Sequence, residues 1–347
     1  MSHPTQAPPL PVPQATKSKG RGVLVFIGVF LIAVCLLVLA AMTFDFGASN
    51  RQKVLSGVVY QESVVEEGEG ISKILILDID GVISSDGGPE DSMIAVVRSQ
   101  LREVRSNPEF SGVLLRVNSP GGGVTASDQI YEEVMKTKAA GKKVLVFMDE
   151  IAASGGYYIA CGADHIIATP TTITGSIGVI ISSINATELL GKIGVKPQVF
   201  TSGDFKDTLS LSREMRPDEK VYIQAMVEAS YQRFISLVSA GRDIDIPTLK
   251  ERNLIDGRIF SGVAAKEAGL VDQVGYWDDA VAKIRSMVGD EQAPLVRVVP
   301  EVDLFDVVSM FGVKAQGSTE VKLDLAPAFG VDLRPAIPYA LPVEYVR

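Results

Sequence analysis

The chain has 347 residues, of which 46% are hydrophobic and 22% are charged. This length suits one large domain or two ordinary ones with a sizeable core, and the composition excludes a chain that is mainly disordered. The formal net charge is −9, and the first 44 residues contain three basic residues and no acidic one, so the remainder is more acidic still. An acidic body disfavours binding to nucleic acid, whose phosphates attract basic surfaces.

The scarcity of cysteine and histidine narrows the chemistry further. The chain has two residues of each type: Cys35 and Cys161, and His3 and His165. These counts exclude a disulfide framework and a cysteine-rich zinc site, and no motif indicates a nucleotide or another cofactor. We therefore expect no cofactor, and a histidine-dependent nucleophile would have to use His165, because His3 lies in a proline-rich tail.

An apolar segment near the N-terminus predicts a membrane anchor. The segment from Val23 to Met42 carries no charge. At about 1.5 Å per residue, such a helix spans roughly 30 Å, the thickness of the hydrocarbon core of a bilayer. Lys17, Lys19 and Arg21 precede it, so the positive-inside rule puts the N-terminus in the cytoplasm and the body outside. A cleaved signal peptide is the alternative, but its apolar region would be shorter.

The sequence predicts five parts along the chain. They are a cytoplasmic tail (1–22), the transmembrane anchor (23–42), a linker (43–70), an extracytoplasmic domain (71–290) and a C-terminal segment of unknown role (291–347). The bilayer around the anchor is one expected partner.

Within the domain, apolar runs alternate with amphipathic stretches, which is typical of repeated βα units. Strands are expected at 71–78, 112–118, 144–148, 165–169 and 178–182, an extended segment at 197–201, and helices at 126–140, 151–160, 186–193, 217–241, 261–268 and 277–287. The sequence therefore predicts an α/β fold with a mostly parallel sheet.

Three glycine-rich patches follow apolar strands, and the first is NSPGGG at 118–123. Proline and glycine end the strand here, and the glycine N–H groups are not obstructed by side chains. Such a turn before a helix could hold an anion or a developing oxyanion. An ordinary tight turn explains the same pattern.

The second patch, AASGGYYIA at 152–160, places Ser154 between a strand and a helix among small neighbours. This is the setting of an exposed nucleophile on a sharp turn, although the residues do not match the G-x-S-x-G motif. A serine at the start of a helix is also a common N-cap. The pattern alone leaves both interpretations open.

A nucleophilic serine needs a base. His165 lies in an apolar strand, where a lone histidine is more typical of an edge or surface residue. A lysine can serve instead when desolvation lowers its pKa, which favours a lysine just beyond an apolar strand. Lys206 follows the apolar Val199 and Phe200 and fits this description, although a surface lysine is the commoner case.

The third patch, TGSIGVI at 174–180, contains Ser176. Its hydroxyl could hydrogen-bond the lysine amine and orient it. An ordinary turn serine is the alternative.

In this order, NSPGG, SGGYYIA, GADHIIATPTTITGSIGVI and the lysine of SGDFKD resemble the signal peptide peptidase A family, which are membrane-bound serine peptidases of the ClpP/crotonase-like superfamily. The resemblance runs over about residues 71–274 and is carried by the ordered combination of motifs. It looks like the short form of the family, in which both catalytic residues sit in one domain, and it implies a ClpP/crotonase-like core.

The resemblance implies a Ser-Lys dyad. The implied roles are nucleophile for Ser154, general base and then acid for Lys206, and orienter of the lysine for Ser176. The backbone N–H groups of Gly155 and of Gly121 or Gly122 would form the oxyanion hole.

The implied activity is hydrolysis of remnant signal peptides at the outer face of a bacterial-type cytoplasmic membrane. The resemblance also implies a homo-oligomer, a ring or a dome. Two alternatives remain open at this point: a crotonase-like acyl-transfer enzyme, and a catalytically inactive membrane scaffold.

Overall fold

The computed structural model describes residues 53–55, 58–86 and 92–300. The expected cytoplasmic tail and the anchor at 23–42 lie outside these residues. Within the described ranges, no helix is both long and apolar enough to cross a membrane. The anchor and its orientation therefore stay predictions.

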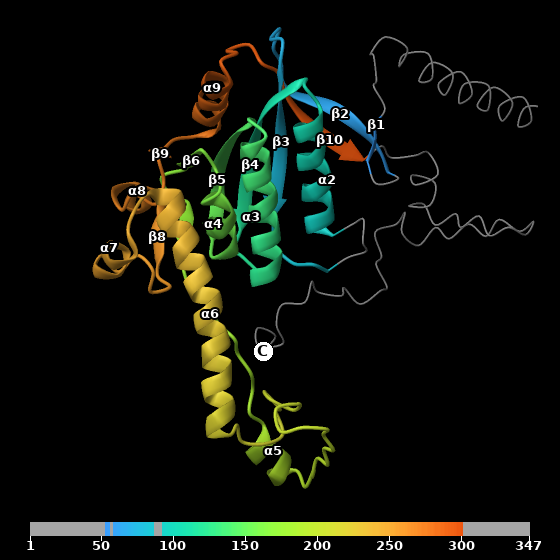
Figure 1. Ribbon diagram of the computed structural model, residues 1–347, viewed down its shortest axis with the longest axis vertical. Helices are drawn as coiled ribbons and strands as arrows, with labels where there is room; N and C mark the ends of the chain where they lie inside the picture. Colours follow the sequence, from blue (N-terminus) through green and yellow to red (C-terminus); the bar gives the residue numbers. More distant parts are fainter. Residues whose placement is uncertain (1–52, 56–57, 87–91, 301–347) are drawn as a thin grey trace, which may run out of the picture. The chain divides into compact units, whose positions relative to one another are not determined.

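The described residues form an α/β unit (Figure 1). The strands are β1 (Lys53–Leu55), β2 (Val58–Glu66), β3 (Lys73–Asp80), β4 (Phe110–Ser119), β5 (Lys143–Ala153), β6 (His165–Ala168), β7 (Ile173–Gly175), β8 (Ile259–Ser261), β9 (Gln273–Val274) and β10 (Leu295–Pro300). The helices are α2 (Met93–Ser106), α3 (Val124–Ala139), α4 (Gly155–Ala160), α5 (Thr187–Lys192), α6 (Pro217–Arg242), α7 (Ile246–Glu251), α8 (Gly262–Glu267) and α9 (Trp277–Val288).

The strands form one sheet in the order β1-β2-β10-β3-β4-β5-β6-β9. All neighbours from β10 to β9 in this order are parallel, whereas β1, β2 and β10 pair antiparallel. The end of β5 turns away from β6 and pairs with the short β7, which in turn pairs with β8. The predicted α/β class with a mostly parallel sheet is confirmed.

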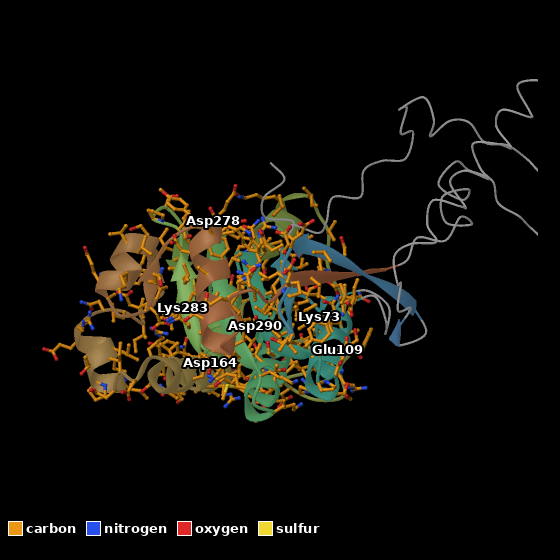
Figure 2. All side chains as sticks on the ribbon, turned by 90° about the horizontal axis from the view of Figure 1, so that it is seen from above. Lys73, Glu109, Asp164, Asp278, Lys283 and Asp290 are labelled. Atoms are coloured by element: carbon orange, nitrogen blue, oxygen red, sulfur yellow. The ribbon has the colours of Figure 1, made fainter. Side chains whose placement is uncertain are left out.

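Both faces of the central strands are buried, which explains why these strands are nearly continuous apolar runs. Leu75, Leu115 and Val146 point to the side that α2, α3 and α4 cover. Ile76 and Leu114 point to the other side, where α9 packs. At the edge where β3 and β4 begin, Figure 2 shows Lys73 and Glu109 side by side, and Lys73 Nζ lies 3.3 Å from Glu109 Oε2.

The folded unit is larger than the expected 71–290 domain. β2 lies inside the stretch interpreted as a linker, and β10 lies beyond residue 290. The two strands pair with each other, and β10 also pairs with β3. Each of them depends on a partner far away in the sequence, so no local pattern reveals the pairing.

The strand expected at 178–182 is wrong, because these residues carry no strand. The segment is apolar and β-branched, which favours a strand locally. However, β7 occupies the place beside the end of β5, and Gly175 at its end has already paired with Ala153. The chain therefore leaves the sheet before it reaches 178–182. Residues 197–201 also carry no strand.

Candidate active site

The first two glycine patches meet at one edge of the sheet, because β4 and β5 are parallel neighbours and end on the same side. A Cβ atom on Gly121 would lie 2.8 Å from Cβ of Ser154 and 2.7 Å from N of Gly155. Gly121 also has a φ of +105°, which favours glycine. The close approach of the two turns therefore requires glycine at this position.

Ser154 occupies the turn between β5 and α4 in a strained conformation. Its φ is +50° and its ψ is −115°, a combination that non-glycine residues rarely adopt. The N–H group of Ser154 donates to the carbonyl of Gly175 at 2.8 Å, and its carbonyl accepts from the N–H of Tyr158. Such strain costs about 1–3 kcal/mol and persists only where surrounding structure fixes it.

The Ser154 hydroxyl does not cap the helix. Ser154 is the N-cap residue of α4, but its side chain accepts no capping hydrogen bond. The N-cap interpretation therefore accounts for the position of Ser154 at the start of α4, but it gives no role to the hydroxyl group. Ser154 is half-buried and lines a pocket.

Two backbone N–H groups beside Ser154 have no acceptor within the described residues. Gly121 donates its N–H to Oγ of Ser119 at 3.1 Å, and Gly123 donates to the carbonyl of Ile83 at 2.8 Å. No such bond is made by the N–H of Gly122 or of Gly155. A Cβ atom on Gly155 would lie 3.2 Å from N of Gly122, so the two groups are close neighbours. This is the arrangement of donors that an oxyanion hole requires.

The pocket around Ser154 is mainly apolar. Its lining residues are Gly122, Val124, Ser127, Ser154, Gly155, Tyr158, Gly178, Val179, Ser230 and Phe234. Sequence reasoning missed Ser127, Tyr158, Ser230 and Phe234 as part of the site. Tyr158 follows Ser154 by one helical turn and could have been found by that spacing. Ser230 and Phe234 share one face of α6, and no local signal links α6 to Ser154.

A polar cluster holds α6 against the pocket. The hydroxyl of Tyr158 donates to a carboxylate oxygen of Asp128 on α3, and Arg233 on α6 donates to the same oxygen at 3.0 Å. Burial, and then the hydrogen bond to Asp128, raises the pKa of Tyr158. The tyrosine therefore stays neutral, and its ring forms a wall of the pocket.

Ser176 lies next to the Ser154 turn. It follows Gly175, whose carbonyl accepts the N–H of Ser154. Ser176 has a φ of +50°, and its N–H donates to the carbonyl of Arg258 at 2.8 Å. The structure thus brings Ser176 to the backbone of Ser154, although Ser176 is not among the pocket-lining residues.

His165 lies at the opposite end of the sheet. It begins β6 and pairs with Leu145 near the start of β5, eight residues before Ala153. At about 3.3 Å per residue, these positions are roughly 25 Å apart along the strand. Burial lowers the pKa of His165, and its Nε2 atom has no hydrogen-bond partner among the residues that the structure describes. His165 therefore has no access to Ser154 within the chain.

Lys206 is exposed and does not line the pocket. It belongs to residues 180–216, which we call the arm. Figure 1 shows α5, within the arm, beside the N-terminal end of α6, the end that points away from the sheet. The described chain therefore brings Ser154, Gly121, Gly122, Gly155 and Ser176 together, and it leaves Lys206 apart from them.

The described residues offer no group of three or more His, Cys, Asp and Glu side chains placed to hold a metal ion. The chemistry visible at this site is that of a serine hydroxyl and backbone donors.

Comparison with known proteins agrees with this geometry. Residues 136–289 match the model of peptidase family S49, and residues 72–174 match that of Clp protease. The chain is 41% identical over 231 residues to "Putative signal peptide peptidase SppA" of Enterococcus faecium, covering 65% of this chain and 66% of that protein. It is 40% identical over 208 residues to "Putative protease slr0021" of Synechocystis, covering 60% of this chain and 72% of that protein.

A longer relative is "Protease 4" of Salmonella typhi, 35% identical over 272 residues, which are 77% of this chain and 43% of that protein. The chain thus spans less than half the length of this relative. Fold, site and relatives together define a serine peptidase with a Clp-like α/β core. The chain belongs to peptidase family S49.

Proposed function

We propose that this protein is a membrane-anchored serine endopeptidase that uses Ser154 and Lys206 as a dyad to hydrolyse remnant signal peptides. The observation that carries the proposal is the strained Ser154, whose hydroxyl does not cap the helix, together with the neighbouring N–H groups of Gly122 and Gly155, which have no acceptor among the described residues. A turn that only connected a strand to a helix would need neither the strain nor the unpaired donors.

The proposed reaction proceeds through an acyl-enzyme. The hydroxyl oxygen of Ser154 attacks the scissile carbonyl carbon while its proton passes to the amine of Lys206. The N–H groups of Gly122 and Gly155 hold the oxyanion that forms. Lys206 then gives the proton to the leaving amine, and a water attacks the ester with Lys206 again as base. Ser176 would accept or donate a hydrogen bond at the lysine amine and orient it.

Because Lys206 is remote from Ser154 in one chain, we propose that the dyad forms in a homo-oligomer such as a ring or dome. The arm is mostly exposed and carries large apolar side chains, among them Ile180, Leu189, Ile193 and Phe200, the last of which is 93% exposed. Apolar surface of this extent is typical of an interface. An arm that docks on a second copy would bury this surface and could carry Lys206 to that copy's pocket.

The proposed substrate follows from the pocket and from the anchor. Val124, Tyr158, Val179 and Phe234 give the pocket apolar walls, which suit an apolar side chain. Signal peptides have an apolar central region. With residues 23–42 as a transmembrane segment, the site would work at the outer face of the cytoplasmic membrane, next to such peptides.

A complementation experiment tests the shared dyad. Ser154→Ala and Lys206→Met variants are each expected to be inactive, whereas a mixed assembly should regain part of the wild-type peptide turnover, because some sites then combine an intact serine with an intact lysine. Mixtures that regain nothing, although mass spectrometry shows mixed oligomers, would contradict a dyad shared between copies. Labelling with a fluorophosphonate, located at Ser154 by mass spectrometry, checks the nucleophile separately.

Of the two alternatives, membership of family S49 favours peptide hydrolysis over acyl transfer from CoA thioesters. A catalytically inactive scaffold makes a different prediction, since Ser154→Ala would then leave the cellular phenotype intact.

A further inference from the structure

A dense polar cluster joins the arm to the first turn of α6, and Lys206 lies beside it. No residue from 180 to 218 is buried, yet Glu219 is completely buried. Glu219 lies in the first turn of α6, where two arginines surround its carboxylate. A buried carboxylate in such an exposed part of the chain requires close pairing.

Arg213 joins the loop of Lys206 to α6. Its Nε atom donates to one carboxylate oxygen of Asp207 at 2.8 Å, and its Nη2 atom donates to the other at 2.7 Å. Nη2 also donates to the backbone carbonyl of Asp207 at 3.3 Å. On its other side, Nη1 of Arg213 donates to Glu219 Oε2 at 2.9 Å. The planar guanidinium thus holds the residue directly after Lys206 in a fixed geometry.

Glu219 accepts further bonds from the same loop. The N–H of Arg216 donates to Glu219 Oε2 at 2.8 Å, and the hydroxyl of Thr208 lies 3.4 Å from Oε1. The hydrogen bonds from Arg213 hold the pKa of Glu219 down to about 2, so the carboxylate is ionised at any working pH. Loop and helix are therefore joined by charge-assisted bonds that do not depend on pH near neutrality.

The residue before Lys206 is held as well. The guanidinium of Arg216 lies over the ring of Phe205, 5.6 Å from its centroid, and the ring of Tyr222 packs on Phe205 at 5.4 Å. The N–H of Lys206 itself donates to the carbonyl of Gly203 at 3.1 Å. Both neighbours of Lys206 are fixed, while its own amine has no partner among the described residues.

The ion pair with Arg213 also fixes the orientation of the Asp207 carboxylate. Asp207 is the acidic residue adjacent to Lys206, and a free carboxylate there would attract the lysine amine and keep it protonated. Hydrogen bonds from Arg213 lower the pKa of Asp207 and occupy both of its oxygens. The charged groups around this cluster are Asp204 and Asp207 on either side of Lys206, Arg213, Glu214 and Arg216 before α6, and Asp218, Glu219 and Lys220 in its first turn.

We propose that Arg213, held between Asp207 and Glu219, is the positioning residue of Lys206: it fixes the loop and keeps the Asp207 carboxylate away from the amine. This inference rests on the proposed role of Lys206 as the base. A purely structural cluster would stabilise the arm without any effect on how the lysine titrates.

The test compares Arg213→Gln with the double variant Arg213→Gln/Asp207→Asn in the full-length protein. Arg213→Gln should lower kcat by about 100-fold with KM nearly unchanged, because the base is misplaced, and should move the acid limb of the pH profile upward. The double variant should regain about tenfold and return the limb, since no carboxylate is then released. Arg98→Gln, which breaks an ion pair between the exposed side chain of Arg98 and the buried Glu133 on the core, is the matched control and should keep full turnover.

Each failure has its own meaning. If Lys206→Met keeps turnover, the proposed dyad fails and the inference with it. If Lys206→Met is inactive but Arg213→Gln keeps its kcat and pH limb, only the positioning role fails. An Arg213→Gln variant that loses activity with an unmoved limb, and with no gain in the double variant, shows a structural role and overturns the proposal.

If Arg213→Gln fails to fold or to assemble, the single variant Asp207→Asn tests the proposal in its place. That change keeps one of the two oxygens that accept from Arg213 and removes the negative charge, so turnover should stay within about threefold of wild type. A loss of about 100-fold in Asp207→Asn would mean that the carboxylate itself is required, which also overturns the proposal.

Discussion

The turn at Ser154 and the arm at Lys206 are built in opposite ways. Residues 155–163, after the serine, are all buried, whereas no residue from 180 to 218 is. The strained φ of Ser154 is held by the sheet, by the carbonyl of Gly175 and by the packed α4. The loop of Lys206 is held by a local cluster around Arg213 and by little else.

This difference indicates that one chain by itself can build the strained turn of Ser154 and the backbone donors beside it, but does not bring the proposed base to them. Backbone strain needs surroundings that fix it, and only the core supplies them. The arm, with its exposed apolar side chains, needs a covering surface before its lysine can be desolvated. The following substitutions test each half of this comparison, beginning with the largest expected effect.

Replacing Ser154 should have the largest effect. Ser154→Gly should lower peptide turnover by at least about 10³-fold, because the attacking oxygen is removed. Its stability should equal or exceed that of wild type, because glycine adopts this φ without strain. Ser154→Ala is the matched variant: it is equally inactive but keeps the strain, so its denaturant midpoint should lie below that of Ser154→Gly. Equal midpoints would mean that the turn is not strained.

Replacing Lys206 tests the arm. Lys206→Met should lower turnover by about 10²-fold or more, because the base is lost. The folding stability of the chain should hardly change, since the side chain is exposed. Lys196→Met, at another exposed lysine of the arm, should keep turnover and stability. Kinetics on a chromogenic peptide and thermal melts of both variants decide this, and a Lys206→Met enzyme with more than a tenth of wild-type turnover speaks against the base.

Replacing Gly121 tests the close approach of the two turns. An alanine there would place its Cβ 2.8 Å from Cβ of Ser154, so we expect about a 10²-fold loss of kcat together with a loss of stability. Gly141→Ala is a matched control, because Gly141 also has a positive φ of +82° but nothing lies within 4 Å of its added Cβ. It should lose about 1 kcal/mol of stability and no activity. If Gly121→Ala and Gly141→Ala had equal effects on kcat, the close contact between the turns of Gly121 and Ser154 would not be what activity requires.

The smallest expected effect is the pH dependence of the arm. The folded pKa of Glu219 is lowered to about 2, so its carboxylate stabilises the arm above its unfolded pKa, and this contribution is lost as the pH falls from about 4.5 toward 2. Glu219→Gln should therefore increase hydrogen exchange in residues 202–216 at pH 7, with a difference from wild type that shrinks toward pH 2. A difference that is constant over this range would show that the ionised carboxylate is not what stabilises the loop.

Much of the core could be predicted from the sequence, because each of its strands and helices has a recognisable pattern of apolar and polar residues along its own segment. The predicted strand at 112–118 and the predicted helix at 217–241 lie within β4 and α6. The expected helix at 277–287 lies within α9 in the same way. By contrast, β10 and its pairing with β2 escaped prediction, because the two strands are more than 200 residues apart in the chain.

The sequence by itself located the turn at Ser154 and the glycine turns, because a strand, a turn of small residues and a helix follow one another within about twenty residues and each leaves a local pattern. The family resemblance then made Ser154 the candidate nucleophile. Only the tertiary structure decided that the N–H of Gly121 donates to Ser119, while those of Gly122 and Gly155 have no acceptor in the described part of the chain. This difference depends on how two separate turns meet. The tertiary structure also placed Phe234 of α6 in the pocket and Lys206 outside it. Such long-range placement follows from packing, which no periodicity in the sequence encodes.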